Sequence, residues 1–343
     1  MFLSNLSLQN FRNYSKSEFN FNQNTTLIVG PNTSGKTNLL EAVFFLSTGK
    51  SFRGADQDVI SFGKDIARIK TEGLETVFAN QAGRFIKKYL VNEVAKHRIN
   101  FVGHLPCVLF APQDLELITS SPAIRRNYLD FILEQVDTNY RRSLLAYQKA
   151  LRARNRLLEN AQKVGRRRET LFDYWDDLII GNGEIITKTR AAFVDFINSQ
   201  SKDVFDFYIE YERNLISKER LLQYKEAELA AGVTLVGPQR DDFSINIFID
   251  KNSTPREIKA FGSRGQQRLA VLQLKMIELK FLTEKLGEKP LLLLDDIFSE
   301  LDAEHISLVL KMIKGQQTII TTTHKELVED SFLKDASMLE LNR

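Results

Sequence analysis

One short stretch constrains this chain more than any other. Residues 25–29 read TTLIV, an apolar and β-branched run that is typical of a buried strand. Residues 30–37 read GPNTSGKT and match the phosphate-binding pattern G-x-x-x-x-G-K-T. Residues 38–46 then carry apolar positions at helical spacing. Because glycines let successive N–H groups turn inward and a helix N-terminus favours anions, this order predicts a strand–loop–helix site for ATP.

The residues of this P-loop have distinct expected roles. Lys36 should reach the β and γ phosphates, and the Thr37 hydroxyl should ligate Mg²⁺. The other expected nucleotide-binding residues of the loop are Gly30, Pro31, Asn32, Thr33, Ser34 and Gly35. A chance glycine loop is the alternative, but it would not need a strand before the motif and a helix after it.

Composition limits the class of protein. A chain of 343 residues with 43% apolar residues is expected to form one large or two smaller domains with a full core. The single cysteine, Cys107, excludes an internal disulfide and fits a reducing compartment. The start has no basic region followed by an apolar core, and the longest aliphatic run, 291–294, is too short to cross a bilayer. We therefore expect a soluble, cytoplasmic protein without a membrane partner.

Positive charge is concentrated in one segment. Residues 141–168 hold ten Lys or Arg and one acidic residue, a net charge of +9, whereas the whole chain carries +3. Such a patch suggests a polyanion as partner, although a solvated helix face is the alternative. The candidate DNA contacts in this segment are Arg152, Arg154, Arg156, Arg166, Arg167 and Arg168.

The periodicity of apolar residues predicts a mixed architecture. Residues 1–22 resemble a β-hairpin, and residues 58–91 resemble short strands separated by glycines. Apolar positions recur at helical spacing over 123–163 and again over 170–202. The C-terminal third alternates helix 266–285, strand 291–295, helix 303–314 and strand 317–322, which indicates an α/β parallel sheet. We predict an ATPase head formed by 1–114 and 233–343 and an inserted helical lobe formed by 115–232.

Two carboxylates end an apolar run near the C-terminus. The leucines 291–294 are followed by Asp295 and Asp296. Beside a P-loop, the first carboxylate can hold Mg²⁺, and the second can orient or deprotonate the attacking water. A buried strand that leads into an acidic turn is the alternative.

Further segments follow the order found in ABC-type ATPases. The S-x-G-Q-Q stretch at 263–267 resembles the signature motif, in which a serine and a glycine contact a γ-phosphate held by a second subunit; Ser263, Gly265 and Gln266 are its candidates. Residues 299–302 resemble the D-loop, His324 the switch histidine and Gln113 the Q-loop glutamine. Each segment alone also fits a plain loop, cap or turn. Their common order favours an ATPase.

The chain resembles the RecF family over essentially its full length. The resemblance rests on Leu8–Tyr14, Gly35–Glu41, Gly49–Arg53, Ser121–Arg126, Gly237–Asp242 and Asp295–Asp302. Thr33 stands where the family often has glycine, and Gln239 stands where histidine is common. The resemblance implies an α/β fold: an ABC/SMC-type P-loop ATPase head with an antiparallel β subdomain and an inserted α-helical lobe.

The resemblance also implies a function. It implies a weak ATPase that forms a homodimer on ATP, binds duplex DNA and single-strand/duplex junctions, and works with RecO and RecR in loading RecA. From the matching segments, it adds Arg12 and Asn38 to the nucleotide contacts and makes Arg53 the first candidate for DNA. Two alternatives stay open: an ATPase subunit that drives a transporter or another machine without DNA, and a DNA clamp that binds ATP without hydrolysis.

Overall fold

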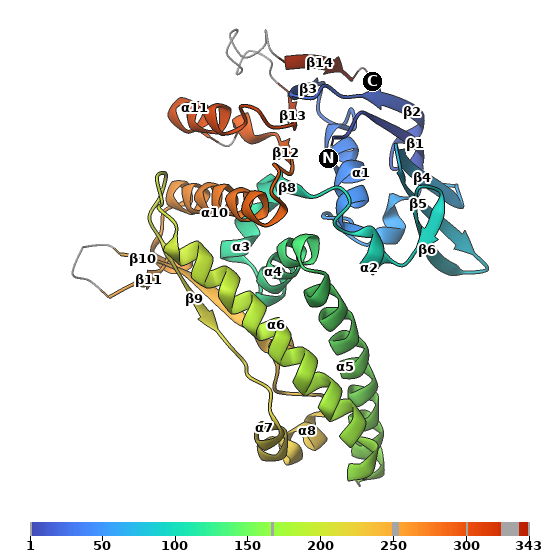
Figure 1. Ribbon diagram of the computed structural model, residues 1–343, viewed down its shortest axis with the longest axis vertical. Helices are drawn as coiled ribbons and strands as arrows, with labels where there is room; N and C mark the ends of the chain where they lie inside the picture. Colours follow the sequence, from blue (N-terminus) through green and yellow to red (C-terminus); the bar gives the residue numbers. More distant parts are fainter. Residues whose placement is uncertain (1, 166–167, 249–253, 300, 324–335, 342–343) are drawn as a thin grey trace. The chain divides into compact units, whose positions relative to one another are not determined.

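The computed structural model describes residues 2–165, 168–248, 254–299, 301–323 and 336–341 (Figure 1). The chain divides into two compact units, Met1–Asp114 with Lys275–Arg343, and Leu115–Leu274. The second unit begins where the sequence placed the start of the helical lobe, but it extends beyond residue 232. The assignment of the two units as ATPase head and helical lobe remains a prediction.

The extension of the second unit has a simple physical cause. Strand β10 (Asp242–Ile247) pairs with β9 (Tyr208–Glu212) on one side and with β11 (Arg256–Glu257) on the other. The inter-strand hydrogen bonds therefore tie residues after 232 to the unit that contains β9. The sequence predicted that 233–274 belongs to the head, since a β pattern returns after Gly232.

A five-stranded parallel sheet lies in the first unit, as the alternation of helix and strand predicted. Asp295 pairs with Thr321, and Thr322 pairs with Val29, so the carboxyl ends of three strands meet at one edge. Ligands of open α/β sheets bind at this edge. The strands, in spatial order, are β14 (Ala336–Glu340), β3 (Thr25–Val29), β13 (Thr318–Thr322), β12 (Leu291–Asp295) and β8 (Cys107–Phe110).

The first unit also contains a six-stranded antiparallel sheet. The hairpin predicted for residues 1–22 and the strands predicted within 58–91 are confirmed, except that 56–59 form a 3-10 helix. The strands, in spatial order, are β2 (Tyr14–Asn20), β1 (Asn5–Phe11), β4 (Ile66–Thr71), β5 (Leu74–Gln81), β6 (Arg84–Val91) and β7 (Val94–Lys96).

Helix α1 (Lys36–Thr48) packs against strands of both sheets. It contacts β12, β13 and β8 of the parallel sheet and β1, β4 and β5 of the antiparallel sheet. Eleven of its thirteen residues are buried, so it is covered on more sides than the single inward face that its spacing suggested. The other short and long helices of this unit are η1 (Asp56–Val59), α2 (Arg98–Phe101), η2 (Pro112–Leu115), η5 (Ile297–Ser299) and α11 (Ala303–Met312).

The second unit is mainly helical. Its two longest helices, α5 (Thr138–Val164) and α6 (Asp173–Ser199), pack side by side (Figure 1). The single helical run expected over 123–163 is broken at Asp137, whose backbone is extended and whose carboxylate accepts the N–H of Tyr140 at 2.9 Å. With this N-cap, a new helix, α5, begins at Thr138. Its other helices are α3 (Glu116–Thr119), α4 (Pro122–Val136), η3 (Glu169–Leu171), α7 (Lys218–Gln223), α8 (Lys225–Ala231), η4 (Pro238–Arg240) and α9 (Ile258–Phe261).

Helix α10 (Arg264–Leu286) carries the chain from the second unit back into the first, with the boundary after Leu274. Across the residues that the structure covers, no helix combines the length and the apolar character that a bilayer crossing demands.

Candidate functional site

The P-loop joins β3 to α1, in the order that the sequence predicted. Gly35 caps α1 with a φ of 105°, and a Cβ there would lie 2.6 Å from the Asn13 Nδ2 atom, so only glycine fits. Thr33 has a φ of 71°, which is a rare conformation for a β-branched residue. The chain thus keeps left-handed backbone at the position where the resemblance led us to expect glycine.

Two side chains of the P-loop, Lys36 and Ser34, carry hydrogen-bond donors that can bind phosphate oxygens. The Lys36 ammonium group turns back onto the loop and donates to the carbonyl oxygens of Gly30 at 2.6 Å and Pro31 at 2.9 Å. Burial lowers the pKa of Lys36, against the opposing effect of Asp296 and Asp295. The Ser34 hydroxyl is buried and has no hydrogen-bond partner among the described residues. A buried donor without a partner is costly, so the loop fits a ligand rich in acceptors.

The two expected magnesium ligands are in contact. The Thr37 hydroxyl donates to Asp295 Oδ1 at 3.0 Å, and the Thr321 hydroxyl donates to the same oxygen at 2.7 Å. Burial raises the pKa of Asp295, which is only 4% exposed. A hydroxyl and a carboxylate this close can share one cation, with phosphate oxygens and water as further ligands. The residues present therefore fit a bound Mg²⁺.

Asp296 follows in a strained conformation. Its φ is 50°, and its N–H donates to the carbonyl oxygen of Thr321 at 3.2 Å. Its Oδ2 accepts from the Ser299 hydroxyl at 2.9 Å, whereas its buried Oδ1 has no partner within the described part of the chain. One carboxylate oxygen is therefore held in place while the other can accept a hydrogen bond from water. This arrangement suits a group that orients or deprotonates a nucleophile.

Gln113 lies at the same edge of the parallel sheet. It follows β8, whose Phe110 pairs with Leu294 of β12, and its side chain is exposed in η2. The neighbouring Asp114 carboxylate lies 3.2 Å from the buried Lys275 ammonium, which anchors this turn. Two further candidates lie outside the described residues: Glu300, which belongs to the D-loop segment, and the switch histidine His324.

The signature segment forms a reciprocal N-cap. The Ser263 Oγ accepts the N–H of Gln266 at 3.2 Å, and Gln266 Oε1 accepts the N–H of Ser263 at 2.9 Å. The cap uses the serine oxygen as an acceptor, so its O–H remains able to donate to another group. A Cβ on Gly265 would meet only Ser263 Oγ, at 3.9 Å. No packing within the described part of the chain requires glycine there, and all three residues are exposed.

The arginines expected at the nucleotide and at DNA both lie near α1. Arg12 forms two hydrogen bonds with Glu41, Nε–Oε2 at 2.8 Å and Nη2–Oε1 at 2.6 Å. Arg53 is exposed and donates to Asn38 Oδ1, in the first turn of α1, at 2.7 Å. Glu41 was within a recognised motif, but the sequence did not indicate its role. Only the fold shows which cations surround it.

Arg154 corrects the predicted DNA surface. It is fully buried, and its guanidinium contacts Asp176 at 2.6 Å and Glu228 at 2.7 Å and donates to Thr234 Oγ1 at 2.9 Å. It follows Tyr147 and Ala150 and precedes Leu158 on the inward side of α5, so it cannot contact DNA in this structure.

The other cations of the segment 141–168 are arranged differently. Arg152, Arg156 and Arg168 are exposed, whereas Arg166 and Arg167 lie outside the described residues. The structure adds cations that the sequence did not single out. The exposed α5 stripe, as we define it, consists of Arg142, Lys149, Arg152, Arg156 and Lys163.

The Gly237–Asp242 motif holds the second unit together. Asp241 is fully buried and accepts from Arg190 Nη1 at 3.0 Å and from the Tyr211 hydroxyl at 2.5 Å. Asp242 pairs with Arg125 through two bonds of 2.6 and 2.9 Å. Gln239 donates to the carbonyl oxygen of Val236 and accepts from the Tyr147 hydroxyl. An amide thus supplies one donor and one acceptor, as a neutral histidine would.

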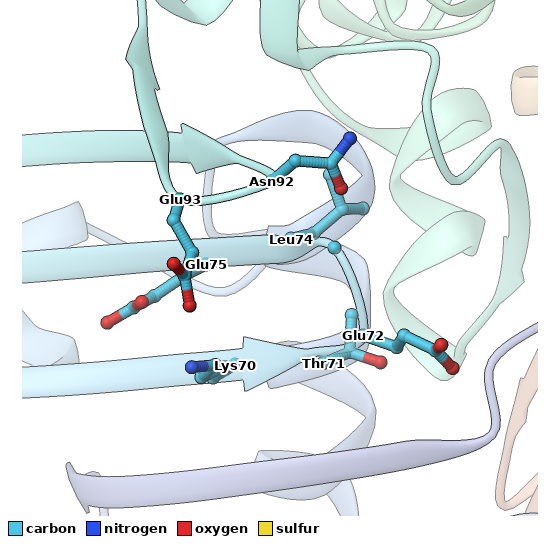
Figure 2. A pocket seen from close by; sticks show the side chains of 8 residues that line it. Lys70, Thr71, Glu72, Leu74, Glu75, Asn92 and Glu93 are labelled. Carbon is cyan, nitrogen blue, oxygen red and sulfur yellow. The ribbon is translucent and has the colours of Figure 1, made fainter.

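A shallow hollow of about 310 Å³ lies at the turns between β4 and β5 and between β6 and β7 (Figure 2). Its lining includes three carboxylates, of Glu72, Glu75 and Glu93, and one ammonium group, of Lys70. None of the residues around it belongs to the motifs above. An acidic lining repels phosphate, so this hollow is not the nucleotide site.

Comparisons with known proteins indicate the family of this chain. The sequence model of the RecF/RecN/SMC N terminal domain matches residues 2–339. The DNA replication and repair protein RecF of Geobacillus sp. (strain WCH70) is 33% identical over 370 residues, which cover 100% of this chain and 97% of that protein. The RecF of Bacillus cereus (strain AH820) is also 33% identical, over 99% of this chain and 97% of its own length.

Solved structures show the same relationship. The structure of the recombination mediator protein RecF with ATP in the RecFOR pathway has a TM-score of 0.85 and 32% identity, covering 96% of this chain and 93% of that one. The Smc head domain of Pyrococcus furiosus, with a TM-score of 0.51 and 18% identity over 99% of this chain and 93% of its own, shares the fold alone. These similarities extend over the whole chain and include both halves of the ATPase motifs. The chain therefore belongs to the RecF family and has the ABC/SMC-type ATPase fold.

Proposed function

We propose that this protein is an ATP-dependent DNA-binding recombination mediator. It hydrolyses ATP slowly, dimerises on ATP at gapped or junction DNA, and acts with RecO and RecR in loading RecA during DNA repair and replication. One observation carries the proposal. Thr37 at the end of the P-loop contacts Asp295 in the first unit, with Asp296 next in the chain, while Ser263 is exposed beside a glycine that no packing among the described residues requires.

Each residue of the proposed site has a distinct role. The backbone N–H groups of the P-loop and the Lys36 ammonium bind the phosphates. Thr37 and Asp295 hold Mg²⁺, which neutralises charge on the phosphates when bound. Asp296 orients the attacking water through its free oxygen, and Gln113 and His324 assist at the γ-phosphate. A carboxylate shorter than glutamate at the water position fits a slow hydrolysis that times release.

The second side of the site comes from another copy of the chain. In a two-fold dimer, each P-loop faces Ser263 and Gly265 of the partner, and two ATP molecules are enclosed. The Ser263 hydroxyl donates to the γ-phosphate, and the absence of a side chain at Gly265 lets the helix N-terminus approach it. ATP then links the two subunits, and hydrolysis separates them.

DNA is bound by phosphate contacts. Arg53 is the first candidate, and the exposed α5 stripe with Arg168 is the second. From Arg142 to Lys163 the stripe is roughly 30 Å long at 1.5 Å per residue, a length comparable to about nine phosphates of one strand. Contacts of this kind read shape and charge and are steeply salt-dependent.

The decisive experiment measures dimerisation by analytical ultracentrifugation with a non-hydrolysable ATP analogue, with and without gapped duplex DNA. We expect a monomer without nucleotide, a dimer with it, and stronger dimerisation on gapped DNA. Ser263→Ala should lower dimerisation by a factor of ten or more, because about 1.5–3 kcal/mol is expected for a hydrogen bond to a charged group. A chain that stays monomeric at saturating nucleotide would contradict the proposal.

The same experiment separates the alternatives. A transporter-type ATPase would dimerise on ATP without any effect of DNA. A clamp without hydrolysis would dimerise on DNA and ATP but show no turnover in a single-turnover assay. The exposed α5 stripe favours the DNA-binding proposal over the transporter alternative.

A further inference from the structure

We propose that Glu41, in the middle of the P-loop helix, is a positioning residue that couples the nucleotide site to the DNA contact at Arg53. The inference rests on the proposed function and adds to it the residue that connects the two ligands. It stands on one buried carboxylate that binds both the arginine expected at ATP and the loop that carries the arginine expected at DNA.

The first connection joins Glu41 to Arg12. Glu41 is 0% exposed, and both of its oxygens accept from the Arg12 guanidinium, at 2.8 and 2.6 Å. A third N–H, on Nη1, donates to the carbonyl oxygen of Asp58 at 2.8 Å. A guanidinium has five N–H groups, so two remain for a phosphate. The Arg12 side chain is 20% exposed, which leaves a path for that contact.

The turn around Arg12 is held in a strained conformation. Arg12 has a φ of 50°, its N–H donates to the carbonyl oxygen of Val59 at 2.7 Å, and its own carbonyl oxygen accepts from the Ser61 hydroxyl at 2.7 Å. Such backbone persists only where surrounding bonds determine it. The backbone of Arg12, from which the guanidinium extends toward Glu41, is therefore fixed independently of the side-chain contacts.

The second connection joins the same carboxylate to Arg53. Glu41 Oε1, which binds Arg12 Nη2, also accepts from the Ser51 hydroxyl at 2.5 Å. The Ser51 oxygen in turn accepts the N–H of Arg53 at 3.0 Å. One oxygen atom thus binds Arg12 directly and is linked to Arg53 through the Ser51 hydroxyl. When a phosphate draws Arg12 away from Glu41 Oε1, the negative charge on this oxygen is less neutralised. The Ser51 hydroxyl, which donates to the same oxygen, is then held more strongly. Because Ser51 accepts the backbone N–H of Arg53, this change reaches Arg53.

A third connection joins the side chain of Arg53 to the P-loop through Asn38 and Asn13. Arg53 Nη1 donates to Asn38 Oδ1 at 2.7 Å, and Asn38 Nδ2 donates to Asn13 Oδ1 at 2.8 Å. Asn13 follows Arg12 in the chain and its side chain also lies 3.4 Å from the carbonyl oxygen of Ser34 in the P-loop. The backbone and the side chain of Arg53 are therefore both tied to the nucleotide site.

A stabilising role alone does not account for this arrangement. Taking a carboxylate and a guanidinium out of water costs several kcal/mol per ion, and an apolar pair of similar size is often as stable. The sharing of Glu41 Oε1 by two partners makes their positions interdependent, which an apolar pair would not do. The geometry therefore points to coupling as the role of this carboxylate.

The test is the ratio of duplex DNA affinities with and without a non-hydrolysable ATP analogue, measured on the full chain. We expect a ratio of about 5 or more in the wild type, within the usual range of coupled sites. Glu41→Gln should bring the ratio below about 2. Because Glu41→Gln leaves the Arg12 charge unpaired and lowers stability, Ser51→Ala serves as the second variant. It leaves the Arg12 pair in place and breaks only the link toward Arg53, so its ratio should also fall below about 2.

Glu18→Gln, a carboxylate exposed on β2, is the matched control and should keep the wild-type ratio. The melting temperature of each variant shows whether the protein is folded. If Ser51→Ala and a folded Glu41→Gln keep the wild-type ratio, the inference is overturned while the proposed function stands. A wild-type ratio of 1, or no DNA binding at all, overturns the coupling together with that part of the proposed function.

Discussion

Charged residues at the carboxyl ends of the parallel strands and charged residues along α5 were both singled out from the sequence, but the structure treats them differently. Asp295 and Asp296 lie where the motif placed them, because a strand end fixes the direction of the residues that follow it. Along α5, Arg152 is exposed and Arg154 is fully buried, although they are two positions apart. A motif tied to backbone geometry specifies position, whereas a run of like charges does not.

Asp296→Asn tests the strand-end side of this comparison and should have the largest effect. Removing a group that orients or deprotonates water is expected to lower the turnover rate by about 10² to 10⁴-fold. The P-loop contacts remain, so the variant should still bind a fluorescent ATP analogue. An unchanged single-turnover rate would show that a carboxylate at a strand end does not by itself identify the chemistry.

Arg154→Met tests the buried side of α5. The change leaves Glu228, which is 0% exposed, without its cationic partner. Breaking a buried ion pair from one side is expected to cost about 3 to 5 kcal/mol in the free energy of unfolding. Urea unfolding measures it, with Arg152→Met as the matched control, for which a change within about 0.5 kcal/mol is expected. Equal losses for the two variants would remove the distinction between the two faces of the helix.

The exposed α5 stripe tests the other face of the same helix. Changing Lys149, Arg152 and Arg156 together to Gln should weaken duplex binding and reduce the slope of log affinity against log salt by about 0.9 for each phosphate that the variant no longer neutralises. A control variant changes three exposed lysines of the first unit, Lys64, Lys88 and Lys96, to Gln. If both triple variants alter the slope equally, net charge rather than the stripe determines binding.

The smallest expected effect concerns Asp295 and depends on pH. Burial raises the pKa of Asp295, so its ionised form is disfavoured in the folded protein without Mg²⁺ and nucleotide. The contribution of this group to stability is full at low pH and is lost as the pH rises through its folded-state pKa. Asp295→Asn has no such titration, so the free energy of unfolding of the variant should rise relative to that of the wild type as the pH increases from below the ordinary aspartate range to neutral. Urea unfolding in a buffer with a chelator measures this difference, and a gap that stays constant with pH would contradict it.

Several features follow from the sequence because local chemistry determines them. The strand–glycine–helix order predicted the P-loop, and the leucine run before Asp295 predicted a buried strand with a carboxylate at its end. The spacing of Ser263 and Gln266 resembles the signature pattern, and the reciprocal cap that they form depends only on residues three apart. In each case the determining contacts are within one element or between neighbouring residues.

Other features depend on residues that are far apart in the chain. The contacts of Glu41 need Arg12 and Ser51, which precede and follow α1 in the chain, and the buried ion pair of Arg154 needs Glu228 from another helix. The grouping of β10 with the second unit needs its pairing with β9. The sequence by itself therefore determined the nucleotide motif and the family, because short-range geometry defines the P-loop and the strand ends. Only the tertiary structure decided which cations of α5 are exposed and which carboxylate contacts both Arg12 and Ser51, because both depend on partners brought together by folding.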